Sequence, residues 1–210
     1  MSLNQGTVYL VDDDASVRRS LGRILSLRDW SVIPLSSSLE FLAFEPKAVP
    51  SCLLLDFQMP DMNGLELQQK MLEQGIHIPI VFLSGQSDIP VSVAAMKLGA
   101  VDFLVKPAEA EQIFEAIEVA FKRHVEQLTS SRECDEILKR LQSLSPRETE
   151  VLKEVVKGRL NKQIGFDFGI AEKTVKVHRA RVMEKMEARS LAQLVRMCYD
   201  VGILDGSEGG

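Results

Sequence analysis

The 210-residue chain is poor in the features that mark disulfide-rich, secreted or membrane proteins. Its three cysteines, Cys52, Cys134 and Cys198, are odd in number and widely scattered, so they give neither a disulfide framework nor metal-ligand spacing. A redox role for Cys134 or Cys198 is a minor alternative. The longest apolar runs have the length of a strand, whereas a membrane-spanning helix needs about 20 apolar residues. Because the acids at 12–14 also argue against a signal peptide, we expect a cytoplasmic protein with no membrane partner.

Internal repeats and low-complexity segments are also missing, and 45% of the residues are apolar, which is enough to build packed cores. The formal net charge of −5 is unevenly distributed. Residues 1–140 carry 13 basic and 20 acidic side chains, whereas residues 141–204 carry 12 basic and 8 acidic ones. This asymmetry indicates an acidic part suited to cations or phosphate chemistry and a basic part suited to a polyanion, although such modest excesses are more often solvated surface.

Up to about residue 124, short apolar strands alternate with helical stretches. Strands are expected at 7–11, 31–34, 51–55, 79–83 and 101–104, and helices at 15–28, 38–44, 64–73, 90–98 and 109–123. Five such units predict a doubly wound α/β domain, in which a five-stranded parallel sheet has helices on both faces. Ligands of such domains bind beyond the carboxyl ends of the strands.

Polar side chains follow the ends of four of these strands. Asp12 and Asp13 follow the first strand, Asp56 ends the third, Ser84 follows the fourth and Lys106 the fifth. The carboxylates make an oxygen-only site suited to Mg²⁺, and a carboxylate can attack a phosphoryl group to form an acyl phosphate. We therefore predict that Asp56 is a nucleophile towards phosphorus. Lys106 and the Ser84 hydroxyl would then contact the phosphoryl oxygens.

Each of these residues has a simpler explanation when it is taken alone. Asp14 is expected to cap the helix that begins at Ala15. Lys106 would be a surface lysine, Ser84 a loop hydroxyl and Phe103 core filler. Only their joint position at the ends of the correct strands favours a phosphoacceptor site.

Residues 5–124 resemble the receiver domain of two-component response regulators without a gap. The resemblance rests on Asp12-Asp13, on Asp56 with Met59, Pro60, Met62, Gly64 and Glu66, and on Ser84-Gly85, Gly99-Ala100, Asp102-Phe103 and Lys106-Pro107. It implies a flavodoxin-like, CheY-like fold. It also implies that Mg²⁺ is bound by Asp13, Asp56 and the backbone carbonyl of Gln58, with Asp12 in or near the coordination shell.

The same resemblance implies a switch that follows phosphorylation of Asp56. Ser84 would turn toward the phosphoryl group and Phe103 would move inward into the vacated space. Phe103 stands where tyrosine is commoner, so its ring can fill the space but cannot donate a hydrogen bond. The Lys106-Pro107 bond is often cis in this family. Such a protein is not an enzyme, beyond assisting its own phosphotransfer and dephosphorylation.

The rest of the chain has a purely helical pattern. Residues 125–143 predict a helical linker, with Thr129-Ser130-Ser131 as its one interruption, and Ser145 and Glu148 form a capping-box signature. Further helices are expected at 146–157, 161–168, 172–186 and 190–201. We therefore predict an all-α helix-turn-helix domain of four helices. The expected organisation is a first domain at 1–124, the linker at 125–143, the helical domain at 144–204 and a tail at 205–210.

The expected helix at 172–186 has one core face and one exposed cationic face. Val175, Val182 and Met186 share the core face. The opposite face carries Lys173, Lys176, Val177, Ala180, Arg181 and Glu184. Apolar residues among exposed cations suit a DNA major groove, where they can touch thymine methyl groups while the cations take phosphates or guanine edges.

Residues 141–203 resemble the LuxR-type DNA-binding domain through the runs 144–152, 158–164 and 174–178. The resemblance implies that Lys176 and Val177 reach base edges, and that Lys162, Lys173, Thr174 and Arg181 contact phosphates. His178 is expected to be structural. The last helix, with Leu191, Leu194, Val195 and Cys198, resembles a dimerisation helix, although packing within the domain explains it equally well.

Three positions bear on how the two central helices of this domain begin and pack. Asn161 is a plausible cap for the helix at 161–168. Gly165 stands where the family usually has alanine, at a cost of about 1 kcal/mol in helix propensity. Ala171 replaces the usual capping serine or threonine.

Together the resemblances identify a response-regulator transcription factor of the FixJ/NarL type. A sensor histidine kinase would phosphorylate Asp56, and the protein would then dimerise, bind promoter DNA and RNA polymerase, and activate rather than repress transcription. Our hypothesis is that the acidic domain masks the recognition helix or blocks pairing, and that the linker relays release. One alternative is a phosphate-independent DNA-binding regulator. The other is a phosphoaspartyl hydrolase with Asp56 as nucleophile and Asp12 as acid/base, but no strand carries the nucleophile and acid two residues apart in the required position.

Overall fold

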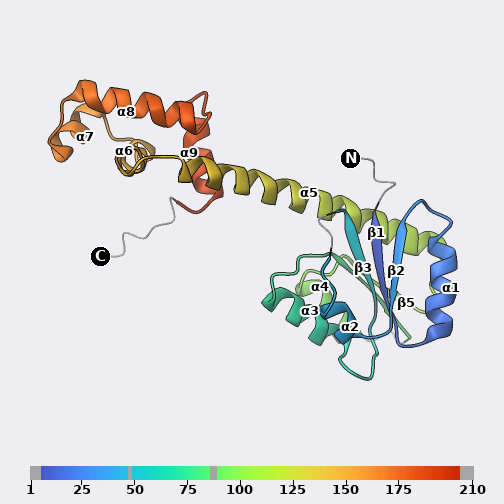
Figure 1. Ribbon diagram of the computed structural model, residues 1–210. Coiled ribbons are helices and arrows are strands. Elements are labelled where there is room, and N and C mark those ends of the chain that lie inside the picture. Colours follow the sequence, from blue (N-terminus) through green and yellow to red (C-terminus); the bar gives the residue numbers. More distant parts are fainter. Residues whose placement is uncertain (1–5, 47–48, 86–88, 204–210) are drawn as a thin grey trace. The chain divides into compact units, whose positions relative to one another are not determined.

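The computed structural model describes residues 6–46, 49–85 and 89–203 (Figure 1). The chain forms two compact units that divide between Thr129 and Ser130. The tail expected at 205–210 lies outside the described residues. Over the part of the chain that is described, none of the helices is long and apolar enough to cross a membrane.

The first unit contains a five-stranded parallel sheet in the order β2-β1-β3-β4-β5. The strands are β1 (Thr7–Val11), β2 (Ser31–Leu35), β3 (Ser51–Asp56), β4 (Ile80–Ser84) and β5 (Asp102–Val105). The pairing aligns the carboxyl ends, because Leu55 lies opposite Val11 and Asp56 lies opposite Leu83. The doubly wound fold predicted from the sequence is therefore confirmed. Strands β4 and β5 each begin one residue later than expected.

Helices cover both faces of this sheet (Figure 1). They are α1 (Ala15–Leu25), α2 (Ser38–Leu42), α3 (Gly64–Glu73), α4 (Ile89–Lys97) and α5 (Ala110–Gln142). Alternate strand residues point to opposite faces, so the unit has two cores. One core packs α1 and the first half of α5 on residues such as Leu10, Leu54 and Val81. The other packs α2, α3 and α4 on residues such as Tyr9, Leu55 and Phe82.

The predicted ends of two helices were wrong. The helices expected at 15–28 and 38–44 end at Leu25 and Leu42. After α1 the backbone hydrogen bonds span three residues instead of four: Leu27 N donates to Ile24 O at 3.1 Å, and Arg28 N donates to Leu25 O at 3.2 Å. This tighter pattern turns the chain out of the α-helix. The start of α1 agrees with expectation, because the Asp14 carboxylate accepts a hydrogen bond from Ser16 N at 2.6 Å.

Helix α5 is continuous through the segment where an interruption was predicted. It runs from Ala110 to Gln142 without a break at Thr129-Ser130-Ser131. The Thr129 hydroxyl donates to Val125 O at 2.8 Å, so this polar side chain is satisfied on the helix itself. The first half of α5 is also held to the sheet, because His124 Nδ1 accepts a hydrogen bond from Ser51 N of β3 at 2.8 Å.

The second unit is helical within the described residues. It contains the end of α5, then α6 (Pro146–Val156), α7 (Asn161–Phe168), α8 (Glu172–Lys185) and α9 (Leu191–Asp200). Their inward side chains form a third core that includes Val151, Ile164, Val175, Val182 and Leu194. The predicted capping box is present at α6: Glu148 N donates to Ser145 Oγ at 3.3 Å, and Ser145 N donates to Glu148 Oε2 at 2.9 Å.

The junction of α7 and α8 has the geometry of a helix-turn-helix. Gly169 ends α7 with a φ of 64°, a left-handed conformation that favours glycine. Asn161 is not the cap that was predicted, since Leu160 occupies that position and Gln163 accepts from Leu160 N at 2.9 Å. Asn161 lies instead on the first helical turn and accepts a hydrogen bond from Arg179 of α8 at 3.3 Å. No side chain caps α8, where Ala171 is the N-cap residue.

Gly165 has a packing reason that the sequence did not reveal. A Cβ atom at this position would lie 2.8 Å from Ile170 O and 3.4 Å from Glu172 N. The backbone of the turn therefore crosses α7 at a distance that only glycine leaves free of strain. The interpretation of Gly165 as a simple loss of helix propensity was incomplete.

Candidate acidic site and nucleic-acid interface

The carboxyl ends of β1, β3 and β5 bring two acids and a lysine into direct contact. Lys106 Nζ lies 2.7 Å from Asp12 Oδ2 and 2.8 Å from Asp56 Oδ1, donating a hydrogen bond to each. Asp12 is 1% and Asp56 7% exposed, so both carboxylates are buried. The Lys106-Pro107 peptide bond is cis. These three residues, which the sequence predicted to meet at strand ends, do meet there.

Burial and charge act in opposite directions at this site. Burial raises the pKa of Asp56, and Asp12 and Asp13 raise it further, while the hydrogen bond and positive charge of Lys106 partly offset that rise. Burial disfavours the charge of Lys106, but its hydrogen bonds to Asp12 and Asp56 outweigh that effect and raise the pKa of the amine. The site therefore holds a buried carboxylate whose charge depends on its cationic neighbours.

Three carboxylates are close enough to share one cation. Asp12, Asp13 and Asp56 can each offer an oxygen within 4.8 Å of the others. Asp12 is committed to the protein, because Oδ1 accepts from Asp14 N at 2.9 Å and Oδ2 binds Lys106. Asp13 and Gln58 are exposed. An oxygen-only set that is open to solvent on one side suits a hard divalent ion that keeps some of its water.

The two predicted switch residues lie close to this site. Ser84 ends β4 and is 2% exposed, and its carbonyl accepts from Lys106 N at 2.7 Å. Phe103 lies on β5 and packs against the rings of Phe57 and Phe82, with 5.9 Å between centroids in each pair. Phe57 and Phe82 were not among the residues predicted for this site. Their apolar positions beside Asp56 and on β4 were the available signal.

Arg18 is a further residue that sequence reasoning missed. Its Nη1 donates to the backbone carbonyl of Asp12 at 2.6 Å, which fixes the end of β1 behind the acidic pair. An arginine in the first turns of a helix gives no pattern that would have identified this contact.

Helix α8 presents the face that was predicted to meet DNA. Val175 and Met186 are fully buried and Val182 is 1% exposed, as expected for its core side. The residues proposed for DNA contact are all exposed: Lys173, Thr174, Lys176, Val177, Ala180 and Arg181 on α8, and Lys162 on α7. Lys176 Nζ is not free, since it lies 2.9 Å from Glu172 Oε1.

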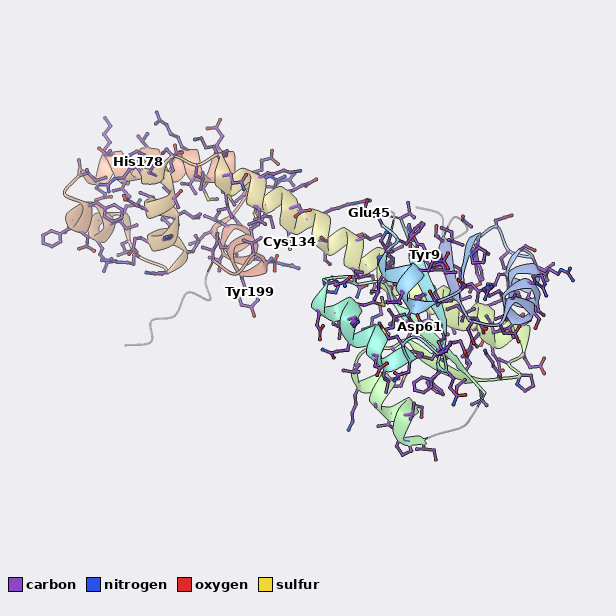
Figure 2. All side chains as sticks on the ribbon, turned by 60° about the horizontal axis from the view of Figure 1, so that its bottom comes forward. Tyr9, Glu45, Asp61, Cys134, His178 and Tyr199 are labelled. Atoms are coloured by element: carbon purple, nitrogen blue, oxygen red, sulfur yellow. The ribbon has the colours of Figure 1, made fainter. Side chains whose placement is uncertain are left out.

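His178 and the three cysteines take no part in either candidate site. His178 is half-buried on α8 (Figure 2), and its Nδ1 is buried without a hydrogen-bond partner in the described part of the chain. Cys52 and Cys198 are fully buried, and burial raises the pKa of each thiol. Cys134 on α5 (Figure 2) lies 3.6 Å from Asp200 O. These positions give no support to a redox role.

The fold and the two sites together define a class of protein, a regulator with an acidic α/β unit joined to a helix-turn-helix unit. Residues 8–118 match the response regulator receiver domain, and residues 142–198 match the bacterial regulatory proteins of the LuxR family. The chain therefore belongs to the response regulators with a LuxR-type DNA-binding domain, a family of transcriptional regulators in two-component systems.

Named relatives span almost the whole chain. The transcriptional regulatory protein FixJ of Rhizobium meliloti is 45% identical over 196 residues, which are 93% of this chain and 96% of that protein. Nodulation protein W of Bradyrhizobium diazoefficiens is 42% identical over 196 residues, 93% of this chain and 86% of that protein. The solved structure of the response regulator StyR is 40% identical with a TM-score of 0.79, covering 92% of this chain and 98% of StyR.

Proposed function

We propose that Asp56 accepts a phosphoryl group from a sensor histidine kinase. The single observation that supports this most strongly is the contact of Lys106 with Asp12 and Asp56 at the carboxyl ends of β1, β3 and β5. In the transfer, a carboxylate oxygen of Asp56 forms a bond to phosphorus as the bond from phosphorus to the kinase histidine breaks. The histidine nitrogen keeps the electron pair and takes a proton from solvent. Lys106 then exchanges a carboxylate partner for a phosphoryl oxygen.

Asp13, Asp56 and the Gln58 carbonyl would hold Mg²⁺, with Asp12 in or near its shell. The bound ion would supply charge neutralisation for the incoming phosphoryl oxygens. The hydrogen bond from Asp14 N holds Asp12, and the hydrogen bond to Asp56 holds Lys106. These contacts would orient the nucleophilic oxygen of Asp56 before the phosphodonor arrives. Ser84 would donate its hydroxyl to the phosphoryl group, and Phe103 would pack inward behind it.

The phosphorylated protein would form a homodimer and bind promoter DNA through α8. Lys176 and Val177 would reach base edges, with Ala180 beside them. Lys162, Lys173, Thr174 and Arg181 would contact phosphates. Activation would follow from recruitment of RNA polymerase. Because promoter DNA and RNA polymerase would be its partners, the protein would act in the cytoplasm. The net positive charge of residues 141–204 supports a polyanionic partner.

The first test compares wild type with Asp56→Asn after treatment with acetyl phosphate and Mg²⁺. Intact mass should show a single phosphate adduct in wild type only, and only wild type should become dimeric by light scattering. The same samples are then titrated into a labelled random-sequence DNA duplex pool. Phosphorylation should strengthen binding of wild type and leave Asp56→Asn unchanged.

Other outcomes would separate the alternatives. No adduct, under conditions that label a known receiver domain, would refute phosphorylation at Asp56. Equal DNA binding with and without the phosphodonor would favour a phosphate-independent regulator. Many cycles of hydrolysis of small phosphate esters would instead indicate a phosphoaspartyl hydrolase, since a regulator gives stoichiometric labelling and slow loss.

A further inference from the structure

Phe166, on helix α7, is a large aromatic side chain that the fold leaves in solvent. It is 87% exposed, although phenylalanine is among the residues most often buried. Its position is well defined by the packing of α7: Ile164 is fully buried in the third core, and Phe166 follows it by two residues, about 200° around the helix. Phe166 therefore points away from the core of its unit.

Lys162 lies on the same outward side of α7. It precedes Ile164 by two residues, so it too lies about 200° from the buried side chain, and it is separated from Phe166 by one turn. The neighbouring side of α7 faces α8, because Asn161 accepts from Arg179 and Gly165 adjoins the first residue of α8. The pair of Lys162 and Phe166 is thus turned outward next to α8.

Helix α8 repeats this arrangement on its own outward face. Val175 is buried, and Lys173 and Val177 lie two residues before and after it, both exposed. Each helix of the helix-turn-helix therefore presents a lysine and, four residues later, an apolar side chain on the side opposite a buried β-branched residue. Since Ile164 and Val175 belong to the same core, both stripes lie on the outer side of this unit.

The charges around Phe166 are compatible with a polyanion. The nearest acid in the sequence, Asp167, forms an ion pair with Arg159, which also binds Glu154 at 2.7 Å. Lys162 forms no ion pair among those found in the described residues, so its charge is available to a phosphate. Phosphate contacts by lysine leave the apolar carbons of the adjoining deoxyribose exposed.

We propose that Phe166 is a DNA-contacting residue that packs against a deoxyribose of the DNA backbone beside the phosphate held by Lys162. This inference rests on the proposed DNA binding by α8, because the first helix of a helix-turn-helix crosses the backbone when the second enters the major groove. The contact is apolar and independent of base sequence. It adds affinity without neutralising a phosphate.

The salt dependence of DNA binding distinguishes this contact from a charged one. Full-length phosphorylated protein is titrated into a labelled random-sequence duplex pool at several salt concentrations. Phe166→Ala should weaken binding on the order of tenfold and leave the slope of log affinity against log salt unchanged. Lys162→Ala should weaken binding and also reduce that slope by about one per protomer. Phe166→Leu should retain most of the affinity.

Two controls keep folding and function separate. Leu27→Ala removes an apolar side chain of 77% exposure from the first unit and should change nothing. Circular dichroism checks that each variant is folded.

If wild type binds and Lys176→Ala weakens binding while Phe166→Ala does not, the inference is wrong and the proposed function stands. If wild type itself fails to bind DNA, the proposed function fails first. Lost transcription with unchanged DNA affinity would assign Phe166 to a protein partner and overturn the proposal.

Discussion

At the scale of single residues, the charge of Lys176 is shared between two uses. Its amine lies 2.9 Å from Glu172 in an exposed ion pair, and the proposed base contact requires it to leave. Exposed pairs are worth at most about 1 kcal/mol, so the amine can be released at small cost. Glu172→Gln should therefore strengthen DNA binding about two- to fivefold at low salt. Fluorescence anisotropy measures this, and Glu115→Gln, on α5 of the first unit, is the control with the same change in net charge.

The benefit of Glu172→Gln should shrink as salt is added, because exposed charges are screened. An unchanged or weaker affinity at low salt would show that Glu172 does not compete with DNA for Lys176.

Glu148 is the residue whose charge most clearly links local contacts to stability. Lys185 binds its carboxylate at 2.6 Å, and this hydrogen bond, together with that from Ser145 N, lowers the pKa of Glu148 to about 2. Because the folded-state pKa lies below the unfolded value of 4.5, the stabilisation is complete above pH 4.5 and is lost as the pH falls toward about 2.

Glu148→Gln should accordingly cost about 1 to 3 kcal/mol in the free energy of unfolding at neutral pH. Urea unfolding at a series of pH values measures the difference between wild type and the variant. That difference should narrow on acidification below pH 4.5. A difference that stayed constant across this range would mean that the carboxylate charge contributes nothing.

At the scale of secondary-structure elements, the sequence predicted every strand and helix of the described residues, whereas it missed some helix ends and several side-chain contacts between elements. Alternating apolar runs and the Asp14 and Ser145 caps are local signals, so the strands and the starts of α1 and α6 were found. The contact of Lys106 with Asp12 follows from strand order, which the parallel pattern supplied. Asn161 was wrongly predicted as a cap because Leu160 takes that position, and its contact with Arg179, 18 residues away, gives no local signal.

Gly165 shows the same limit in its packing. Propensity alone predicts that alanine would stabilise α7, by up to about 1 kcal/mol. A Cβ there would lie 2.8 Å from Ile170 O, and a backbone atom cannot move aside cheaply. Gly165→Ala should therefore destabilise the second unit by about 1 to 2 kcal/mol.

Gly22→Ala on α1 is the matched control, since a Cβ there would meet nothing within 4 Å and should be neutral or stabilising. Thermal unfolding by circular dichroism follows the helices of both units. The fluorescence of Trp30, the single tryptophan of the chain, follows the first. Stabilisation by alanine at both positions would show that the turn relaxes freely around residue 165.

At the scale of the whole molecule, two units with different chemistry share one helix. The first holds the acidic site and the second holds the exposed face of α8, while α5 runs from Ala110 to Gln142 across the division at Thr129. Within the second unit, the end of α5 and the segment after it bind the end of α8: Arg140 lies 2.7 Å from Glu187, and Lys185 donates to Ser143 O at 3.0 Å. A change in α5 can therefore reach α8 through these contacts.

If a helical α5 transmits the state of Asp56, loosening it midway should uncouple the two units. Replacing Ser130 and Ser131 by glycine weakens the helix by several tenths of a kcal/mol per residue, whereas replacing both by alanine strengthens it. Phosphorylation by acetyl phosphate should be equal in both variants. The gain in DNA affinity on phosphorylation should fall in the glycine variant and persist in the alanine variant. An equal gain in all three proteins would mean that α5 acts only as a tether, and that the units communicate through dimer formation alone.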